Sequence, residues 1–143
     1  MKKRMVALMS AMLLLCALPM ATVHAEPDLE PLVTETVVEE YLYTDSVMST
    51  LSFSGSTANC YSSVYGNSKC TKIEGTQRLQ KKTLWWWTDV KAWSKTVEGK
   101  SLIMSNTATV TESGTYRVRI DAKVYSGNDY EEVYCNSPER EKS

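Results

Sequence analysis

The sequence predicts an all-β protein, a small antiparallel β-sandwich of about six or seven strands, with no substantial helix in the exported domain. Three observations predict this class. From Val47 onward, apolar and polar residues alternate with a period of two, which is the pattern of strands with one buried face. Turn-forming Gly, Asn, Asp and Ser residues separate these segments at short intervals. No later segment has a convincing helical period.

The alternating segments are bounded by turn signals, for example at 65–68, 112–114 and 126–129. The clearest strand is expected over 116–124, where charged residues occupy the second face. The apolar faces in chain order are Val47, Leu51 and Phe53; Ala58, Cys60, Ser62 and Val64; Ile73, Gly75 and Leu79; Leu102, Met104, Ala108 and Val110; and Tyr116, Val118, Ile120, Ala122 and Val124. A last short strand is expected over 130–135.

One solvent-exposed face and one buried face per segment is typical of antiparallel sheets packed face to face. We therefore expect two sheets that are immunoglobulin-like in general architecture. A short barrel is the structural alternative. A chain of this size buries roughly two thirds of its unfolded surface, which is enough for one core.

The first 25 residues have the layout of a secretory signal peptide. Lys2, Lys3 and Arg4 precede an uncharged apolar run, and Ala25 offers a small residue before a cut at Glu26. A membrane anchor is the alternative, but the apolar run is shorter than the roughly 20 residues that a spanning helix needs. Lipidation at Cys16 is a second alternative, although Leu15 stands where that signal requires a small residue. We expect a secreted, extracellular protein.

The expected organisation is a signal peptide over 1–25, an acidic extended leader over 26–45, a β-sandwich domain over 46–136 and a polar C-terminal tail over 137–143. The whole chain has a net charge of −1, which gives no bias toward nucleic acid. Cleavage would remove three basic residues and lower the net charge to −4. It would also remove His24, which is the single histidine, and with it all histidine-based catalysis and metal binding.

Three cysteines remain after cleavage, so at least one has no intramolecular partner. Cys60 and Cys70 flank the turn at 65–68, and in an exported protein we expect a disulfide between them. A two-residue turn would point the two sulfurs to opposite faces, so the bridge needs a longer loop or a bulge. Cys135 is the rival partner for Cys60.

A cluster of tryptophans is the candidate ligand-contacting site. Strict alternation over 84–94 places Trp85, Trp87 and Trp93 on one strand face together with charged residues. Exposed indoles of this kind suit stacking on sugar rings or a membrane interface. The alternative is that they cap an open end of the sandwich as part of the core. Between these two readings we expect a split, with Trp93 fixed against protein and Trp85 free.

Carboxylates offer no catalytic pair that stands out. Asp129, Glu131 and Glu132 lie at a turn, and Asp89 with Glu74 is the other candidate pair for glycoside chemistry. The sequence contains no phosphate-binding glycine loop, zinc ligand set or EF-hand series. We therefore expect no catalytic residues, no cofactor, no metal and no enzyme activity.

Four stretches carry a resemblance to a known group of proteins. They lie at 71–73 running into 79–82, at Trp87, Val90 and Trp93, at 114–119 and at 124–127. The chain resembles small secreted proteins of Firmicutes, clostridial ones especially, that are grouped as a domain of unknown function. The resemblance covers roughly 51–133 and implies export and a β-rich domain. It implies no activity.

The sequence favours a non-enzymatic extracellular binding module whose partner is an envelope glycan or another surface protein. The alternative is a secreted membrane-active antimicrobial or toxin-like factor, because Lys81 and Lys82 stand beside three tryptophans. The negative net charge and the lack of an amphipathic helix weigh against that alternative. No stable membrane span is expected after cleavage.

Export makes a direct prediction about the N-terminus. We expect the mature protein in culture supernatant to begin at Glu26, because the cut follows Ala25. Mass spectrometry of the secreted protein measures this. Recovery only from membranes, with a lipid on Cys16, would contradict the prediction.

Overall fold

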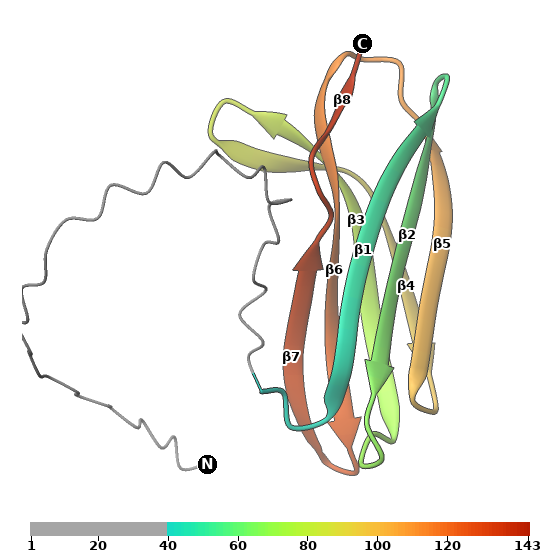
Figure 1. Ribbon diagram of the computed structural model, residues 1–143, viewed down its shortest axis with the longest axis vertical. Coiled ribbons are helices and arrows are strands. Elements are labelled where there is room, and N and C mark those ends of the chain that lie inside the picture. The colour runs from blue at the N-terminus through green and yellow to red at the C-terminus, as the bar shows by residue number, and fades with distance from the viewer. Residues whose placement is uncertain (1–39) are drawn as a thin grey trace, which may run out of the picture. The chain divides into compact units, whose positions relative to one another are not determined.

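The computed structural model of the protein describes residues 40–143, which form eight strands and no helix (Figure 1). The strands are β1 (Thr44–Ser54), β2 (Thr57–Gly66), β3 (Lys72–Thr83), β4 (Trp86–Val97), β5 (Ser101–Thr109), β6 (Gly114–Ser126), β7 (Asp129–Asn136) and β8 (Arg140–Lys142). Nothing in this part of the chain is a helix that could cross a membrane. The predicted signal peptide and most of the predicted leader lie outside the described residues.

The strands form two antiparallel sheets, which confirms the predicted all-β sandwich. One sheet has the order β1-β2-β5, and the other has the order β4-β3-β6-β7, with β8 also paired to β6. In immunoglobulin constant-type domains, strands one, two, four and five share a sheet, and strands three, six and seven form the other. This chain differs in its fourth strand, which pairs with the third.

The core lies between the sheets and is built from the alternating positions of each strand. In β6, Tyr116, Val118, Ile120, Ala122 and Val124 are all buried. They pack against Val64 and Leu102 in one cluster and against Leu51, Ala58 and Leu79 in a second. The predicted phase of these strands is therefore confirmed. Ser62 is also buried, although it is polar.

A network of polar side chains runs through this apolar core. The fully buried Gln77 in β3 donates from Nε2 to the Ser62 hydroxyl, 2.9 Å away, and more weakly to the Met104 carbonyl at 3.3 Å. Its Oε1 accepts a hydrogen bond from Asn106 in β5 at 2.9 Å. The Ser62 hydroxyl lies 2.9 Å from that of Ser49 in β1. Among residues 40–143, no buried side-chain nitrogen or oxygen lacks a hydrogen-bond partner.

Tyr116 makes a second buried polar contact, which the sequence pattern did not reveal. Its hydroxyl donates to the carbonyl of Glu112, four residues earlier, at 2.8 Å. A tyrosine near the start of the sixth strand that bonds the backbone just upstream is the tyrosine corner of immunoglobulin-like sandwiches. Phe53 packs edge-on against the same ring, with ring centroids 5.6 Å apart. The contact fixes the chain where it passes from β5 to β6.

Both ends of the domain differ from the predicted boundaries. Tyr41 and Tyr43 pack against the core, and the Leu42 and Tyr43 amides donate to the Glu131 carboxylate at 2.7 Å each. The end of the predicted leader is therefore part of the domain.

At the other end, the predicted C-terminal tail contains β8, which pairs with Gly114–Tyr116 of β6. Pro138 separates β7 from β8 because proline has no amide hydrogen to donate. Between the two strands, the Val118 amide donates to the hydroxyl of buried Ser137 at 2.8 Å, so the edge of β6 stays paired.

The buried network predicts the effect of removing its central amide. Gln77→Ala leaves a cavity and removes one hydrogen-bond partner from each of Ser62 and Asn106, and we expect it to lower the free energy of unfolding by about 2–4 kcal/mol. Thr76→Ala is the matched control, because Thr76 lies one residue earlier on the opposite face. We expect it to stay within about 0.5 kcal/mol of the parent. Equal denaturation midpoints for the two variants would contradict this role for Gln77.

Candidate functional site

Cys60 and Cys70 do not form the predicted disulfide; both are free and buried. The reason is the path of the chain. β2 and β3 belong to different sheets, so the turn between them closes no hairpin. Cys70 packs on Gly66, so tightly that a β-carbon at Gly66 would collide with it, whereas Cys60 lies six residues back along β2. Six strand residues span roughly 20 Å, far beyond the reach of a disulfide.

Cys135 is not the partner of Cys60 either. It is a free, partly buried thiol that packs against the first core cluster, whereas Cys60 lies in the second. In antibody domains, the cysteine of the second strand bonds to a cysteine two residues after the corner tyrosine. That position here is Val118, which lies in the same cluster as Cys60. Burial raises the pKa of Cys60 to about 11.

The three candidate tryptophans do not share a face. In the pairing of β3 with β4, Leu79 is opposite Lys91 and Gln80 is opposite Asp89, so Val90 is an extra residue. Such a bulge shifts the side-chain alternation by one. Trp87 therefore lies on the outer face of the five-stranded sheet, whereas Trp93 points inward and packs against both core clusters. The predicted three-indole face is wrong because the sequence pattern does not reveal the bulge.

Trp85 occupies a third environment, at the end of the β3–β4 hairpin. It is 84% exposed and stands edge-on to Trp86, with ring centroids 6.1 Å apart. The expected contrast between a fixed Trp93 and a free Trp85 is confirmed. Whether Trp85, Trp87 or Trp93 contacts a ligand stays a prediction.

The outer face of the five-stranded sheet gathers polar side chains from four strands. Strand pairing aligns them in rows across the sheet. The rows are Asp89, Gln80 and Arg117; Ala92, Arg78, Arg119 and Asn136; Ser94, Thr76, Asp121 and Tyr134; Thr96, Glu74, Lys123 and Glu132; and Lys72, Tyr125 and Tyr130. Arg117, Arg119 and Lys123, on the outward face of β6, thus lie in the middle of a larger mixed surface.

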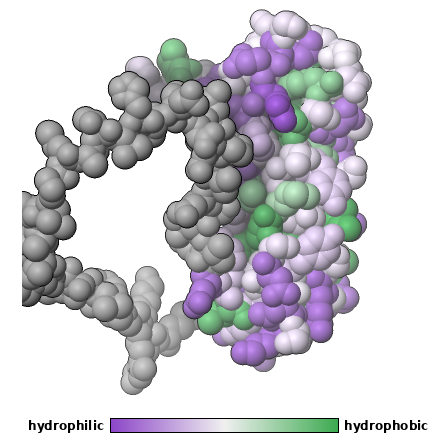
Figure 2. Space-filling model, viewed as in Figure 1, coloured by the Kyte–Doolittle hydropathy of each residue, from purple (hydrophilic) through white to green (hydrophobic). Residues whose placement is uncertain are grey.

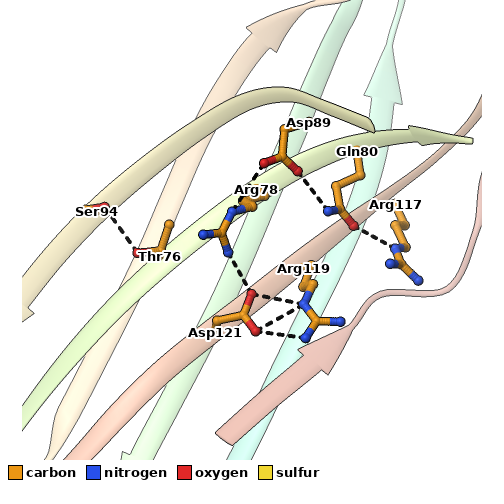
Figure 3. A network of polar contacts seen from close by, with 8 residues as sticks. All are labelled: Thr76, Arg78, Gln80, Asp89, Ser94, Arg117, Arg119 and Asp121. Atoms are coloured by element: carbon orange, nitrogen blue, oxygen red, sulfur yellow. Dashed lines mark hydrogen bonds and ion pairs between the residues drawn. The ribbon is translucent and has the colours of Figure 1, made fainter. Parts of the chain in front are cut away.

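Asp121 is the hub of this surface (Figure 3). Its carboxylate accepts a hydrogen bond from Arg78 Nη1 at 2.7 Å and two from Arg119, from Nε and Nη2, at 2.9 Å each. These bonds raise the pKa of Arg119. Both guanidinium groups are therefore held in fixed orientations, with other N–H donors left over.

On the same face, the network continues from Arg78 to Asp89 in the edge strand β4. Arg78 Nε lies 3.4 Å from Asp89, which also accepts from Gln80 Nε2 at 2.8 Å. Gln80 Oε1 in turn accepts from Arg117 Nε at 2.9 Å. Arg117 makes no ion pair within residues 40–143, and partial burial followed by repulsion from Arg119 lowers its pKa.

Aromatic rings flank the arginines on both sides. The Arg117 guanidinium lies 4.1 Å from the Trp87 ring centroid, and the Arg119 guanidinium lies 4.5 Å from that of Tyr134. Farther along β7, Lys123 lies 5.0 Å from the Tyr130 ring. Stacking of this kind orients both the ring and the cation.

A hollow of about 490 Å³ opens over the middle of this face. Its lining includes Arg78, Arg119 and Asp121 together with the hydroxyls of Thr76 and Ser94 and the ring of Tyr134. Tyr134 is 57% exposed, so much of its ring is available to a ligand. The volume lies within the range of small-ligand sites. This hollow is the candidate binding site.

The carboxylates considered from the sequence lie in two separate places on the five-stranded sheet. Glu131 is used by the chain itself, since it accepts hydrogen bonds from Leu42, Tyr43 and Thr44. Glu74 and Asp89 are roughly 20 Å apart, because Asp89 pairs with Gln80, six residues along β3 from Glu74. Glycoside hydrolysis needs two carboxyl groups within about 10 Å. Nor does the described part of the chain gather three or more potential metal ligands.

Comparisons with known proteins found no match for this chain: no family model, no curated protein and no solved structure. The resemblance to small secreted clostridial proteins therefore stays a prediction.

The free cysteines predict a thiol titration. In denaturant, the chain from Glu26 should show three reactive thiols, because Cys60, Cys70 and Cys135 are all unpaired. In the folded protein they should react slowly, since burial raises the pKa of each and reduces the thiolate. A count of one thiol in denaturant would reveal a disulfide.

The same burial predicts a pH dependence. The folded pKa of Cys60, about 11, lies above the ordinary value of 9.0. The stability that the buried, protonated thiol of Cys60 contributes is therefore complete below pH 9.0. This stability is lost as the pH rises toward 11. In thermal melts, Cys60→Ala should weaken the fall of the melting temperature at alkaline pH. An unchanged fall would contradict the prediction.

Proposed function

We propose that the protein is a secreted, non-enzymatic binding module that recognises a glycan of the cell envelope through the hollow on the outer face of the five-stranded sheet. The observation that carries the proposal is the combination in one hollow of fixed arginines, a carboxylate, hydroxyls and an exposed tyrosine ring. Sugars present hydroxyl groups around an apolar ring face, and this hollow offers matching partners for both.

Preorganisation supports a binding role. The side chains of Arg78 and Arg119 are already held by Asp121, and Thr76 is bonded to Ser94 at 3.2 Å. Because these side chains are already ordered, binding of a ligand costs little side-chain conformational entropy. More of the interaction energy then appears as affinity. The arginines also favour glycans that carry carboxylate or phosphate groups.

A surface protein is the other partner that the sequence left open. A stable protein interface buries roughly 800 Å² on each partner and has few charged residues at its centre. The centre of this sheet face is an arginine–aspartate network, with Arg78, Arg119 and Asp121 next to each other. The glycan is therefore the partner we favour.

Retention on insoluble glycans tests the proposal. The chain from Glu26 is incubated with purified peptidoglycan, with walls that carry teichoic acid and with neutral polysaccharides, and the bound fraction is measured. We expect retention on at least one anionic envelope glycan. Tyr134→Ala should weaken it by about tenfold, because the exposed ring in the hollow is lost.

Tyr130→Ala is the matched control. Tyr130 lies on the same strand and face and is 48% exposed, but it does not line the hollow. We expect it to bind like the parent, and both variants should melt like the parent. Absence of retention on every glycan would overturn the proposal, as would equal binding by the two variants.

A further inference from the structure

The end of the β3–β4 hairpin exposes three large apolar side chains in succession. Leu84 is 72% exposed, Trp85 84% and Trp86 49%. Figure 1 shows that this end of the hairpin projects away from the two sheets, and Figure 2 shows hydrophobic colour at its extremity, at the upper left. We call Leu84, Trp85 and Trp86 the hairpin tip. No other three consecutive residues among 40–143 are all large, apolar and this exposed.

The backbone of the tip is strained at the residue that protrudes. Leu84 has φ of 54°, and within residues 40–143 it is the single non-glycine residue with positive φ. It is the first of two turn residues, a position that favours glycine in hairpins. A bulky residue in this region is an outlier. Since its side chain is mostly exposed, packing within the domain does not explain why leucine stands there.

Three lysines, Lys81, Lys82 and Lys91, lie on the two strands of the hairpin behind the tip. Lys82 lies 5.8 Å from the Trp87 ring centroid, and Lys91 lies 5.4 Å from that of Trp93. Lys81 pairs with Glu112 at 2.7 Å, and Lys82 lies 3.7 Å from Glu139, so these two positive charges are partly balanced. Lys91 has no ion-pair partner within the described residues.

We propose that the hairpin tip docks on the surface of an anionic phospholipid membrane, where Leu84, Trp85 and Trp86 enter the boundary between headgroups and acyl chains and the lysines stay among the headgroups. Exposed tryptophan and leucine with lysines behind them are the composition of membrane-interface anchors. A convex end of three side chains is too small for the roughly 800 Å² that a protein partner would bury.

Docking at this tip is shallow and separate from glycan binding. The strands behind the tip carry the charged outer face, with Asp89 and Gln80 in its first row, so deeper insertion would bury charges. Trp85 and Trp86 also do not line the hollow. Contact with lipid and contact with a glycan can therefore occur together, and each can fail without the other.

Vesicle co-sedimentation tests the proposal. The chain from Glu26 is mixed with phosphatidylcholine vesicles that contain phosphatidylglycerol, and tryptophan emission and the release of an enclosed dye are followed in parallel. We expect binding, a blue shift of emission and no dye release. Trp85→Ala should weaken binding by about tenfold while the melting temperature stays unchanged. Leu84→Gly should weaken binding and also raise the melting temperature, because glycine relieves the strain at this turn position.

Two controls separate the tip from other surfaces. Met48→Ala removes an exposed apolar side chain from β1, and Tyr134→Ala alters the hollow; both should bind vesicles like the parent. The proposal is overturned if the parent does not bind vesicles, if both tip variants bind like the parent, or if either control loses binding. Dye release would also overturn it, in favour of a membrane-active factor.

Discussion

The buried amide of Gln77 is the interaction on which the arrangement of the two sheets depends. It lies in β3 but finds its partners on Ser62, Asn106 and the Met104 carbonyl, in β2 and β5 of the opposite sheet. An unpaired amide in an apolar core is costly, so placements of one sheet against the other that break these bonds are disfavoured. Apolar contacts are less selective, because they tolerate small shifts as long as area is buried.

The same strand links the core to the candidate site. Side chains alternate along β3, so the residues on either side of Gln77, which are Thr76 and Arg78, must face outward. Arg78 then meets Asp121 from β6, and Asp121 orients Arg119. The fixed geometry of the hollow is thus a consequence of the packing behind it. A site placed on strands in this way is more rigid than a site on loops.

The bulge at Val90 lies between the hollow and the hairpin tip, which are the two surfaces to which we assign binding. The bulge places Trp87 on the outer face beside Arg117 and turns Trp93 into the core. Bulges also bend the strand that contains them, and the end of the β3–β4 hairpin projects from the sandwich (Figure 1). The tip therefore stands apart from the hollow, which would allow a wall polymer and a membrane surface to be contacted by different ends of one sheet.

The sequence alone determined the class of fold and the buried face of most strands, because period-two alternation is a local property that each segment carries by itself. Val118 and Ile120 are buried and Arg119 faces outward as that pattern predicts. The tertiary structure decided what depends on partners far away in the chain. The crossing between sheets keeps Cys60 away from Cys70, and the bulge opposite Leu79 divides the tryptophans. Pairing with the start of β6 makes a strand of the predicted tail. Sheet membership and register are set by which distant strands satisfy each other's backbone hydrogen bonds, and no pattern within a single segment records that choice.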